Sequence, residues 1–163
     1  MQELDRIYRD NFTKVYRYIL SMTGDTHLAE DIAQETFFKA LQKLDDFRGE
    51  CSLTTWLCRI ARNQYLNHVG RQSRIREISK QNPPEANNGL SAEDELILKE
   101  QTSEILDALR KLEEPYKEVF SLREFCELSY KEIGKIFHKN DSWARVIYYR
   151  GKLKLKEELK NEY

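Results

Sequence analysis

The sequence predicts an all-α protein in which two small helical domains are joined by a flexible linker. Apolar residues recur at a spacing of three and four along most of the chain, and no segment of strand length alternates between apolar and polar residues. The segment QNPPEANNGLS, at 81–91, interrupts this pattern with paired prolines, asparagines and a glycine. We therefore expect a first domain at 1–80, a linker at 81–93 and a second domain at 94–163.

The first domain should contain three helices. The first is expected at about 2–22, before Gly24 and Asp25, and the second at about 27–44. The third should begin after Ser52, which suits an N-cap, and continue to about residue 79. Residues expected to face a shared core are Leu4, Tyr8, Phe12, Val15, Ile19, Met22, Leu28, Ile32, Phe37, Ala40, Leu41, Leu44, Leu53, Trp56, Leu57, Ile60 and Ala61.

The second domain should contain a helix-turn-helix. A helix restarts near Ala92, and a break at Pro115 begins another. Ser129 and Glu132 have the spacing of a capping box, which predicts the start of a short helix. A turn at 138–140 follows, and then a long basic helix whose N-cap is Asn140 or Asp141. A short capped helix, a tight turn and a basic helix are typical of DNA-binding helix-turn-helix motifs, in which the second helix enters the major groove.

Charge is distributed unevenly, although the net charge is only −1. Residues 59–80 hold six basic residues and one acidic residue, and residues 131–163 hold nine and five. The acidic blocks are 1–50, with seven basic and ten acidic residues, and 81–130, with five and twelve. Two separate basic blocks indicate two contacts with nucleic acid, and the acidic surfaces remain for a protein partner.

Several classes of protein are disfavoured by the residues present. The three cysteines are odd in number and lack zinc-ligand spacing, so we expect reduced thiols near the core and no metal; a redox pair of Cys51 and Cys58 is the alternative. The chain has no phosphate-binding glycine loop, no clustered acids suited to magnesium and no nucleophile with a base, so we expect no catalysis and no cofactor. No membrane span or signal peptide is evident, which indicates a cytoplasmic protein without membrane insertion.

The segment from Phe47 to Arg71 carries the clearest binding pattern. A polar loop with Phe, Arg and Gly leads into a helix on which Arg59, Arg62 and Asn63 lie between apolar positions. An exposed basic face beside such a loop can hold a nucleic-acid backbone and an unstacked base. An ordinary amphipathic helix with solvated charges is the alternative interpretation of this segment.

Three segments in the same order resemble one family. HLAEDIAQETFFKALQKL, at 27–44, is similar to the polymerase-binding helix of sigma factors, and FRGECSLTTWLCRIARN, at 47–63, to their promoter-melting element. LEEPYKEVFSLREFCELSYKEIGKIF, at 112–137, resembles the start of their second DNA-binding domain. The two-domain organisation resembles the extracytoplasmic-function (ECF, group 4) sigma factors of the sigma-70 family.

The resemblance implies three sets of contact residues. The set for core RNA polymerase is Asp31, Gln34, Glu35 and Phe37. The set for the −10 promoter element is Phe47, Arg48, Gly49, Glu50, Cys51, Ser52, Leu53, Arg59, Arg62 and Asn63. The set for the −35 element is Arg123, Lys131, Arg145, Val146, Tyr149, Arg150 and Lys152. Trp143-Ala144 stand where the family often has Thr-Val, and Gly134 and Gly151 replace customary alanines. Trp143 could pack on Phe137 or contact a sugar.

The resemblance also implies a function in transcription initiation, often in stress responses, with core RNA polymerase, promoter DNA and an anti-sigma factor as partners. A self-sufficient helix-turn-helix regulator is the second hypothesis, although such proteins are usually dimers and no sustained heptad seam is present. An enzyme acting on nucleic acid is a third and weaker hypothesis. Specific duplex binding without polymerase would favour the second.

Overall fold

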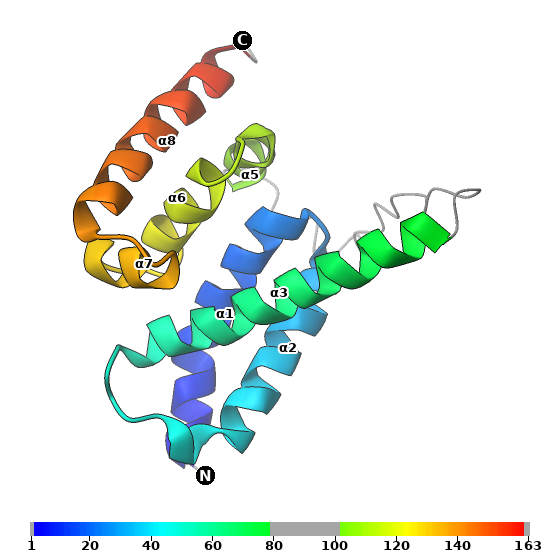
Figure 1. Ribbon diagram of the computed structural model, residues 1–163, viewed down its shortest axis with the longest axis vertical. Helices are drawn as coiled ribbons and strands as arrows, with labels where there is room; N and C mark the ends of the chain where they lie inside the picture. The colour runs from blue at the N-terminus through cyan, green and yellow to red at the C-terminus, as the bar shows by residue number, and fades with distance from the viewer. Residues whose placement is uncertain (1, 79–101, 162–163) are drawn as a thin grey trace.

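The computed structural model describes residues 2–78 and 102–161, which contain seven α-helices, one short 3-10 helix and no strand (Figure 1). The all-α prediction is confirmed. The expected linker at 81–93 and the helix start near Ala92 lie outside the described residues. The elements are α1 (Gln2–Thr23), α2 (Thr26–Gln42), η1 (Leu44–Asp46), α3 (Leu53–Ile78), α5 (Thr102–Lys111), α6 (Tyr116–Glu124), α7 (Tyr130–Ile136) and α8 (Asp141–Asn161).

Helices α1, α2 and α3 pack against one another in the first domain, and α3 extends well past the other two (Figure 1). The core of this domain includes Val15, Ile19, Ile32, Leu57 and Ala61, all at most 4% exposed. These five predicted core positions are confirmed. Burial of their side chains stabilises the domain by about 1.5–3 kcal/mol for each large aliphatic residue.

Two expected core residues are on the surface instead. Tyr8 is 43% exposed and Leu41 is 52% exposed. The buried face of α2 is centred on Ile32, Thr36 and Ala40, and Leu41 follows Ala40 by one residue, so it lies about 100° around the helix. The end of α2 also differs from the expectation, because Leu44 belongs to the short 3-10 helix rather than to α2.

Side-chain caps set the starts of α2 and α3. The Asp25 carboxylate accepts hydrogen bonds from the amides of His27 and Leu28, at 3.0 and 3.2 Å. The Ser52 hydroxyl accepts one from the Thr55 amide at 3.2 Å, which confirms Ser52 as the expected cap. Each cap satisfies amides that have no partner within the helix, and such a cap is typically worth about 1 kcal/mol.

Helices α5 to α8 form the second domain, whose core includes Leu109, Val119, Leu122, Ile133 and Ala144, each fully buried. In α7, the Ser129 hydroxyl accepts from the Glu132 amide at 3.1 Å while the Glu132 carboxylate accepts from the Ser129 amide at 2.9 Å. This is the predicted capping box. The Asn140 side chain accepts from the Trp143 amide at 2.8 Å, so Asn140 is the N-cap of α8.

The turn between α7 and α8 closes back on α7. The Lys139 amide donates to the Gly134 carbonyl at 2.8 Å, and the His138 amide donates to the Lys135 carbonyl at 3.3 Å. His138 has a φ of 56°, in the left-handed region. These features define a Schellman motif, which ends α7 and sets the direction of α8.

The two domains contact each other mainly through α1 and α6 (Figure 1). The Tyr18 hydroxyl donates to the Glu118 carboxylate at 2.6 Å, and the Ser21 hydroxyl is 2.8 Å from that of Ser121. At the edge of this interface, Lys14 forms an exposed ion pair with Glu127 at 3.5 Å. The second domain therefore has a defined position against the first in this structure.

Candidate nucleic-acid interface

The loop before α3 presents the polar part of the predicted −10 set. Arg48, Gly49, Glu50 and Ser52 are exposed, and Cys51 is half-buried. Phe47 is anchored below them, because its ring centroid lies 5.1 Å from that of Trp56. The loop is thus held at one end by an aromatic contact while its charged and small residues face solvent.

Leu53 begins α3 at the end of this loop and is half-buried against the core. Trp56, one turn later, is also half-buried and packs against the core, as its helical position predicted. These two apolar residues therefore fix the end of the loop on the first domain, and the surface available to a partner is formed by residues 48–52.

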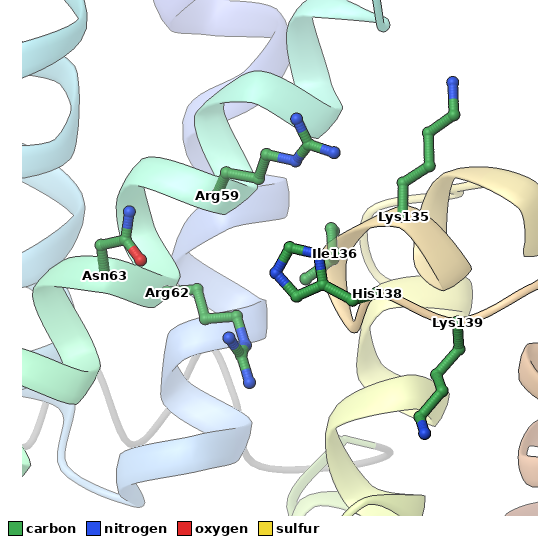
Figure 2. Close-up of a pocket in the computed structure, with 7 residues that line it drawn as sticks. All are labelled: Arg59, Arg62, Asn63, Lys135, Ile136, His138 and Lys139. Atoms are coloured by element: carbon green, nitrogen blue, oxygen red, sulfur yellow. The ribbon is translucent and has the colours of Figure 1, made fainter.

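A basic cleft of about 560 Å³ lies between α3 and the end of α7 (Figure 2). Arg59, Arg62 and Asn63 project from the α3 side. The opposite wall comes from the second domain, and none of the described residues that line the cleft is acidic. An anion such as a nucleic-acid phosphate would meet several donors here. The lining residues from the second domain are Lys135, Ile136, His138 and Lys139.

Sequence reasoning missed Lys135, His138 and Lys139 as neighbours of α3. They belong to the second basic block, but no local pattern indicates which helix they would face. Their position at the turn of the helix-turn-helix can be predicted from the sequence. Their proximity to α3 also depends on how the two domains pack.

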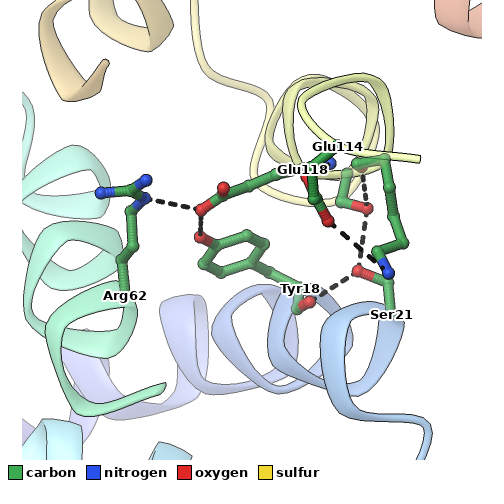
Figure 3. Close-up of polar contacts among 7 residues, drawn as sticks. Tyr18, Ser21, Arg62, Glu114 and Glu118 are labelled. Atoms are coloured by element: carbon green, nitrogen blue, oxygen red, sulfur yellow. Dashed lines mark hydrogen bonds and ion pairs between the residues drawn. The ribbon is translucent and has the colours of Figure 1, made fainter. Parts of the chain in front are cut away.

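The three predicted α3 residues are not equivalent. Arg62 donates from Nε to a Glu118 carboxylate oxygen at 2.7 Å (Figure 3). Its guanidinium carbon lies 4.9 Å from the centre of the Phe137 ring. The side chain of Arg62 is 26% exposed. Arg59 is half-buried and Asn63 is exposed, and both line the open cleft. In this arrangement Arg62 is occupied by the second domain.

The predicted −35 residues of α8 share an exposed surface. Arg145, Arg150 and Lys152 are exposed, Val146 is 46% exposed and Tyr149 is 54% exposed. A helix with this surface can enter the major groove, where Arg pairs with guanine and apolar groups contact the thymine methyl group.

One further residue of this surface was missed by sequence reasoning. Leu153 is 63% exposed and lies two helical turns after Val146 on the same side of α8. The signal that could have found it is this seven-residue spacing from Val146.

Arg123 and Lys131 differ in their surroundings. Arg123 donates to the Leu128 carbonyl at 2.9 Å and its guanidinium stacks 4.3 Å above the Tyr130 ring. Arg145 approaches the same ring at 5.3 Å. Lys131 is exposed at the start of α7. Arg123 therefore holds the loop between α6 and α7, and Lys131 is free to approach a backbone phosphate.

Two tyrosine hydroxyl groups support these elements. Burial, together with the neighbouring Glu118 carboxylate, raises the pKa of Tyr18 well above its usual value. Burial and a hydrogen bond to Glu124 raise the pKa of Tyr148. Tyr148 stacks on Phe120 with ring centroids 5.6 Å apart, so α8 is fixed to α6 directly beneath the exposed recognition surface.

The predicted polymerase-binding residues divide into surface and core. Asp31, Gln34 and Glu35 are exposed on one side of α2. Phe37 is only 7% exposed, and its ring packs 5.2 Å from Tyr8. Phe37 therefore belongs to the core and supports this face rather than forming it. The exposed aromatic residue is Phe38, at 61%, which sequence reasoning missed although it lies seven residues after Asp31.

The residues described offer no group of three or more His, Cys, Asp and Glu side chains placed to hold a metal ion. The three cysteines are free, with Cys58 and Cys126 buried and Cys51 half-buried. A hydrogen bond to Cys58 and burial raise the pKa of the Cys126 thiol, which disfavours the reactive thiolate. Within 2–78 and 102–161, no helix is long and apolar enough to cross a membrane.

Comparison with known proteins agrees with this geometry. Sigma-70 region 2 matches residues 7–75, and sigma-70 region 4 matches residues 102–155. The chain is 34% identical over 164 positions to the RNA polymerase sigma factor YlaC of Bacillus subtilis (strain 168), covering 96% of this chain and 91% of YlaC. It is 29% identical to the ECF sigma factor SigM of the same strain, covering 94% and 93% of the two chains.

The fold has a close counterpart among solved structures. The sigma factor RpoE of Bartonella quintana, solved in complex with the anti-sigma factor NepR, superimposes with a TM-score of 0.77 at 20% identity, covering 98% of both chains. Two helical domains, one with a basic helix beside a polar loop and one with an exposed recognition helix, define a DNA-binding transcription factor. The chain belongs to the ECF sigma factors of the sigma-70 family, which direct RNA polymerase to promoters.

Proposed function

We propose that this chain is a group 4 sigma factor that acts in the cytoplasm, has no catalytic activity of its own and reads promoters through the two surfaces described above. The observation that supports this most directly is the placement of the two surfaces. The exposed face of α8 is on one domain, and the loop at 47–53 with the basic row of α3 is on the other. A promoter with two separated elements requires that arrangement.

The second domain supplies docking on duplex DNA at the −35 element. Arg145 and Arg150 approach base edges, and Lys131 and Lys152 neutralise backbone phosphates. Val146 and Tyr149 make apolar contacts in the groove. Phosphate contacts set position and base contacts set sequence preference, so the two groups of residues have separable effects.

The first domain supplies capture of the opened −10 strand. Extruding a base costs a few kcal/mol, and the loop at 47–53 provides a place for the unstacked base. Arg59, Arg62 and Asn63 hold the backbone beside it. Because these contacts exist only with the open strand, their free energy shifts the promoter from the closed to the open state.

The exposed face of α2 supplies attachment to core RNA polymerase. We assign this face to Asp31, Gln34, Glu35, Phe38 and Leu41, with Phe37 as the core residue that supports it. Acidic groups around exposed apolar residues are typical of a protein interface with a basic partner. Attachment to polymerase also tethers both domains near DNA, which raises their effective concentration.

An anti-sigma factor is the expected inhibitory partner. The sigma factor RpoE, which shares this fold, was solved in complex with the anti-sigma factor NepR. CnrH, which also shares this fold, was solved in complex with the cytosolic domain of CnrY. Such a partner would control when the chain reaches polymerase.

Run-off transcription tests the proposal. Purified core polymerase is given a library of genomic fragments from the host, with and without the chain. Discrete start sites that appear only with the chain support the proposal and give the promoter sequences. The absence of new starts, with folded chain and active polymerase, contradicts it and favours a polymerase-independent regulator, for which a palindromic duplex site would be sought.

A further inference from the structure

A buried carboxylate joins the two domains. Glu118, on α6, is 6% exposed, and one of its oxygens accepts two hydrogen bonds (Figure 3). The Tyr18 hydroxyl on α1 donates at 2.6 Å, and Arg62 Nε on α3 donates at 2.7 Å. We call these three residues the Glu118 network. Both donors come from the first domain and the acceptor comes from the second.

Burying a carboxylate is costly unless hydrogen bonds and an opposite charge compensate for lost water. Here Tyr18 and Arg62 supply a hydrogen bond and the opposite charge, and they can do so only while the domains are together. When the domains separate, water must replace both donors. The Glu118 network is therefore a contact specific to the closed arrangement.

Other contacts join the same faces. The Ser21 and Ser121 hydroxyls are 2.8 Å apart in the buried interface. The guanidinium of Arg62 lies over Phe137, at the end of α7, with 4.9 Å to the ring centre. Arg62 is thus held by the second domain at two points, through its charge and through its planar face.

The consequence for the two DNA-reading surfaces is unequal. Arg62, from the proposed −10 set, has 26% of its side chain exposed and its charge is neutralised. Tyr149 and Val146, from the proposed −35 set, are 54% and 46% exposed. The closed arrangement occupies a residue that would hold the −10 strand and leaves the face of α8 open.

We propose that Glu118 is an internal competitor for the −10 strand: its carboxylate occupies the place of a DNA phosphate on Arg62, and the free chain stays closed until polymerase separates the domains. This inference rests on the proposed function for the role of Arg62. It predicts that release of Glu118 strengthens binding to the −10 strand and not to the −35 duplex.

The test uses the full chain in three forms: wild type, Glu118→Ala, and Glu127→Ala as matched control. Glu127 also bridges to α1, through Lys14, but that ion pair is exposed. Small-angle X-ray scattering measures the radius of gyration. Fluorescence anisotropy measures binding to a −10 non-template oligonucleotide and to a −35 duplex, both taken from a promoter mapped by run-off transcription.

We expect Glu118→Ala to increase the radius of gyration and to tighten binding of the −10 oligonucleotide about tenfold, as for loss of one charged hydrogen bond that competes with the strand. Binding of the −35 duplex should be unchanged, and Glu127→Ala should match wild type throughout. Unchanged dimensions and unchanged oligonucleotide binding in Glu118→Ala would overturn the inference.

Exchanging the two charges distinguishes loss of the Glu118 network from a general disturbance of folding. Glu118→Arg alone should open the chain, and the double variant Arg62→Glu with Glu118→Arg should restore the compact dimensions. A double variant as expanded as the single one would count against the network. Scattering requires neither polymerase nor promoter, so a chain that is closed through Glu118 but inactive in run-off transcription would contradict only the proposed function.

Discussion

The backbone carbonyl oxygen of Lys139 lies so close to Gly134 that a β-carbon at position 134 would be 2.7 Å from it. The Asn140 carbonyl oxygen would be 2.8 Å away. Both oxygens belong to the backbone of the turn that leads from α7 into α8, so neither can rotate aside. Glycine in the middle of α7 therefore permits the close return of the chain that defines the helix-turn-helix.

Gly134→Ala should consequently destabilise the protein, although alanine is the better helix former. We expect a loss of about 1–3 kcal/mol, the usual cost of an added group in a packed site. Gly70→Ala is the matched control, because a β-carbon there would meet no atom of the described residues within 4 Å. That change should stabilise by about 0.5–1 kcal/mol. Urea unfolding followed by circular dichroism distinguishes the two, and a neutral Gly134→Ala would contradict the steric account.

Local signals along the chain were sufficient to predict most of the fold. The capping box of Ser129 and Glu132 and the cap at Ser52 depend on residues three positions apart, and the structure has both. Of the alternatives given for Trp143, the packing on Phe137 is present, since the two ring centroids lie 5.3 Å apart. Such features are predictable because their partners are close in sequence.

Contacts between distant residues could not be predicted in the same way. Tyr18 and Glu118 are separated by 100 positions, and each alone looks like an ordinary surface polar residue. The polymerase contact was expected at Phe37 rather than Phe38 for another reason. The apolar spacing already places Phe37 in the core, and its contacts with Tyr8 and Phe12 confirm this. The resemblance nevertheless assigns the polymerase contact to Phe37, whereas the exposed aromatic residue is Phe38.

The exposure of Phe38 leads to a prediction about polymerase binding. Phe38→Ala should weaken binding to core RNA polymerase by about 1–2 kcal/mol, because an exposed aromatic residue at an interface is often a major contributor. Its effect on the free energy of unfolding should be within about 0.5 kcal/mol, as for most surface changes. Competition with a labelled sigma factor for core polymerase gives the affinity.

Phe37→Ala is the matched control for that prediction. Removing a buried phenyl ring should lower the free energy of unfolding by about 3–5 kcal/mol. If Phe38→Ala leaves the affinity for polymerase unchanged, the face assigned to α2 is wrong. If Phe37→Ala leaves stability unchanged, its assignment to the core is wrong.

The recognition surface of α8 gives a prediction about sequence preference. Arg150→Ala should weaken binding to mapped promoters by about 1–3 kcal/mol, and transcription from them should fall accordingly. It should also relax the base preference at one position of the −35 element. Lys160→Ala, exposed near the end of the same helix, is the control. It should reduce binding slightly and equally for all sequences. Run-off transcription on a library randomised at −35 measures both effects, and an unchanged preference in Arg150→Ala would place base readout elsewhere.

Glu132 gives a prediction about pH. Burial acts to raise the pKa of this carboxyl group, but hydrogen bonds from the Ser129 amide and from the hydroxyls of Ser52 and Thr55 outweigh burial, and the pKa is lowered. Ser52 and Thr55 belong to the first domain and Glu132 to the second. The ionised carboxylate therefore stabilises both the start of α7 and the closed arrangement.

A carboxyl group whose pKa is lower in the folded state adds stability above its unfolded pKa, and that stability is lost as the pH falls through the folded value. Glu132→Gln should therefore cost about 1 kcal/mol at pH 7. The difference from wild type should begin to shrink below about pH 4, where the unfolded chain binds a proton that the folded chain does not yet bind. Glu157→Gln, an exposed change on α8, should follow wild type throughout. Urea unfolding from pH 3 to 7 measures this, and a pH-independent cost for Glu132→Gln would show that shape rather than charge is responsible.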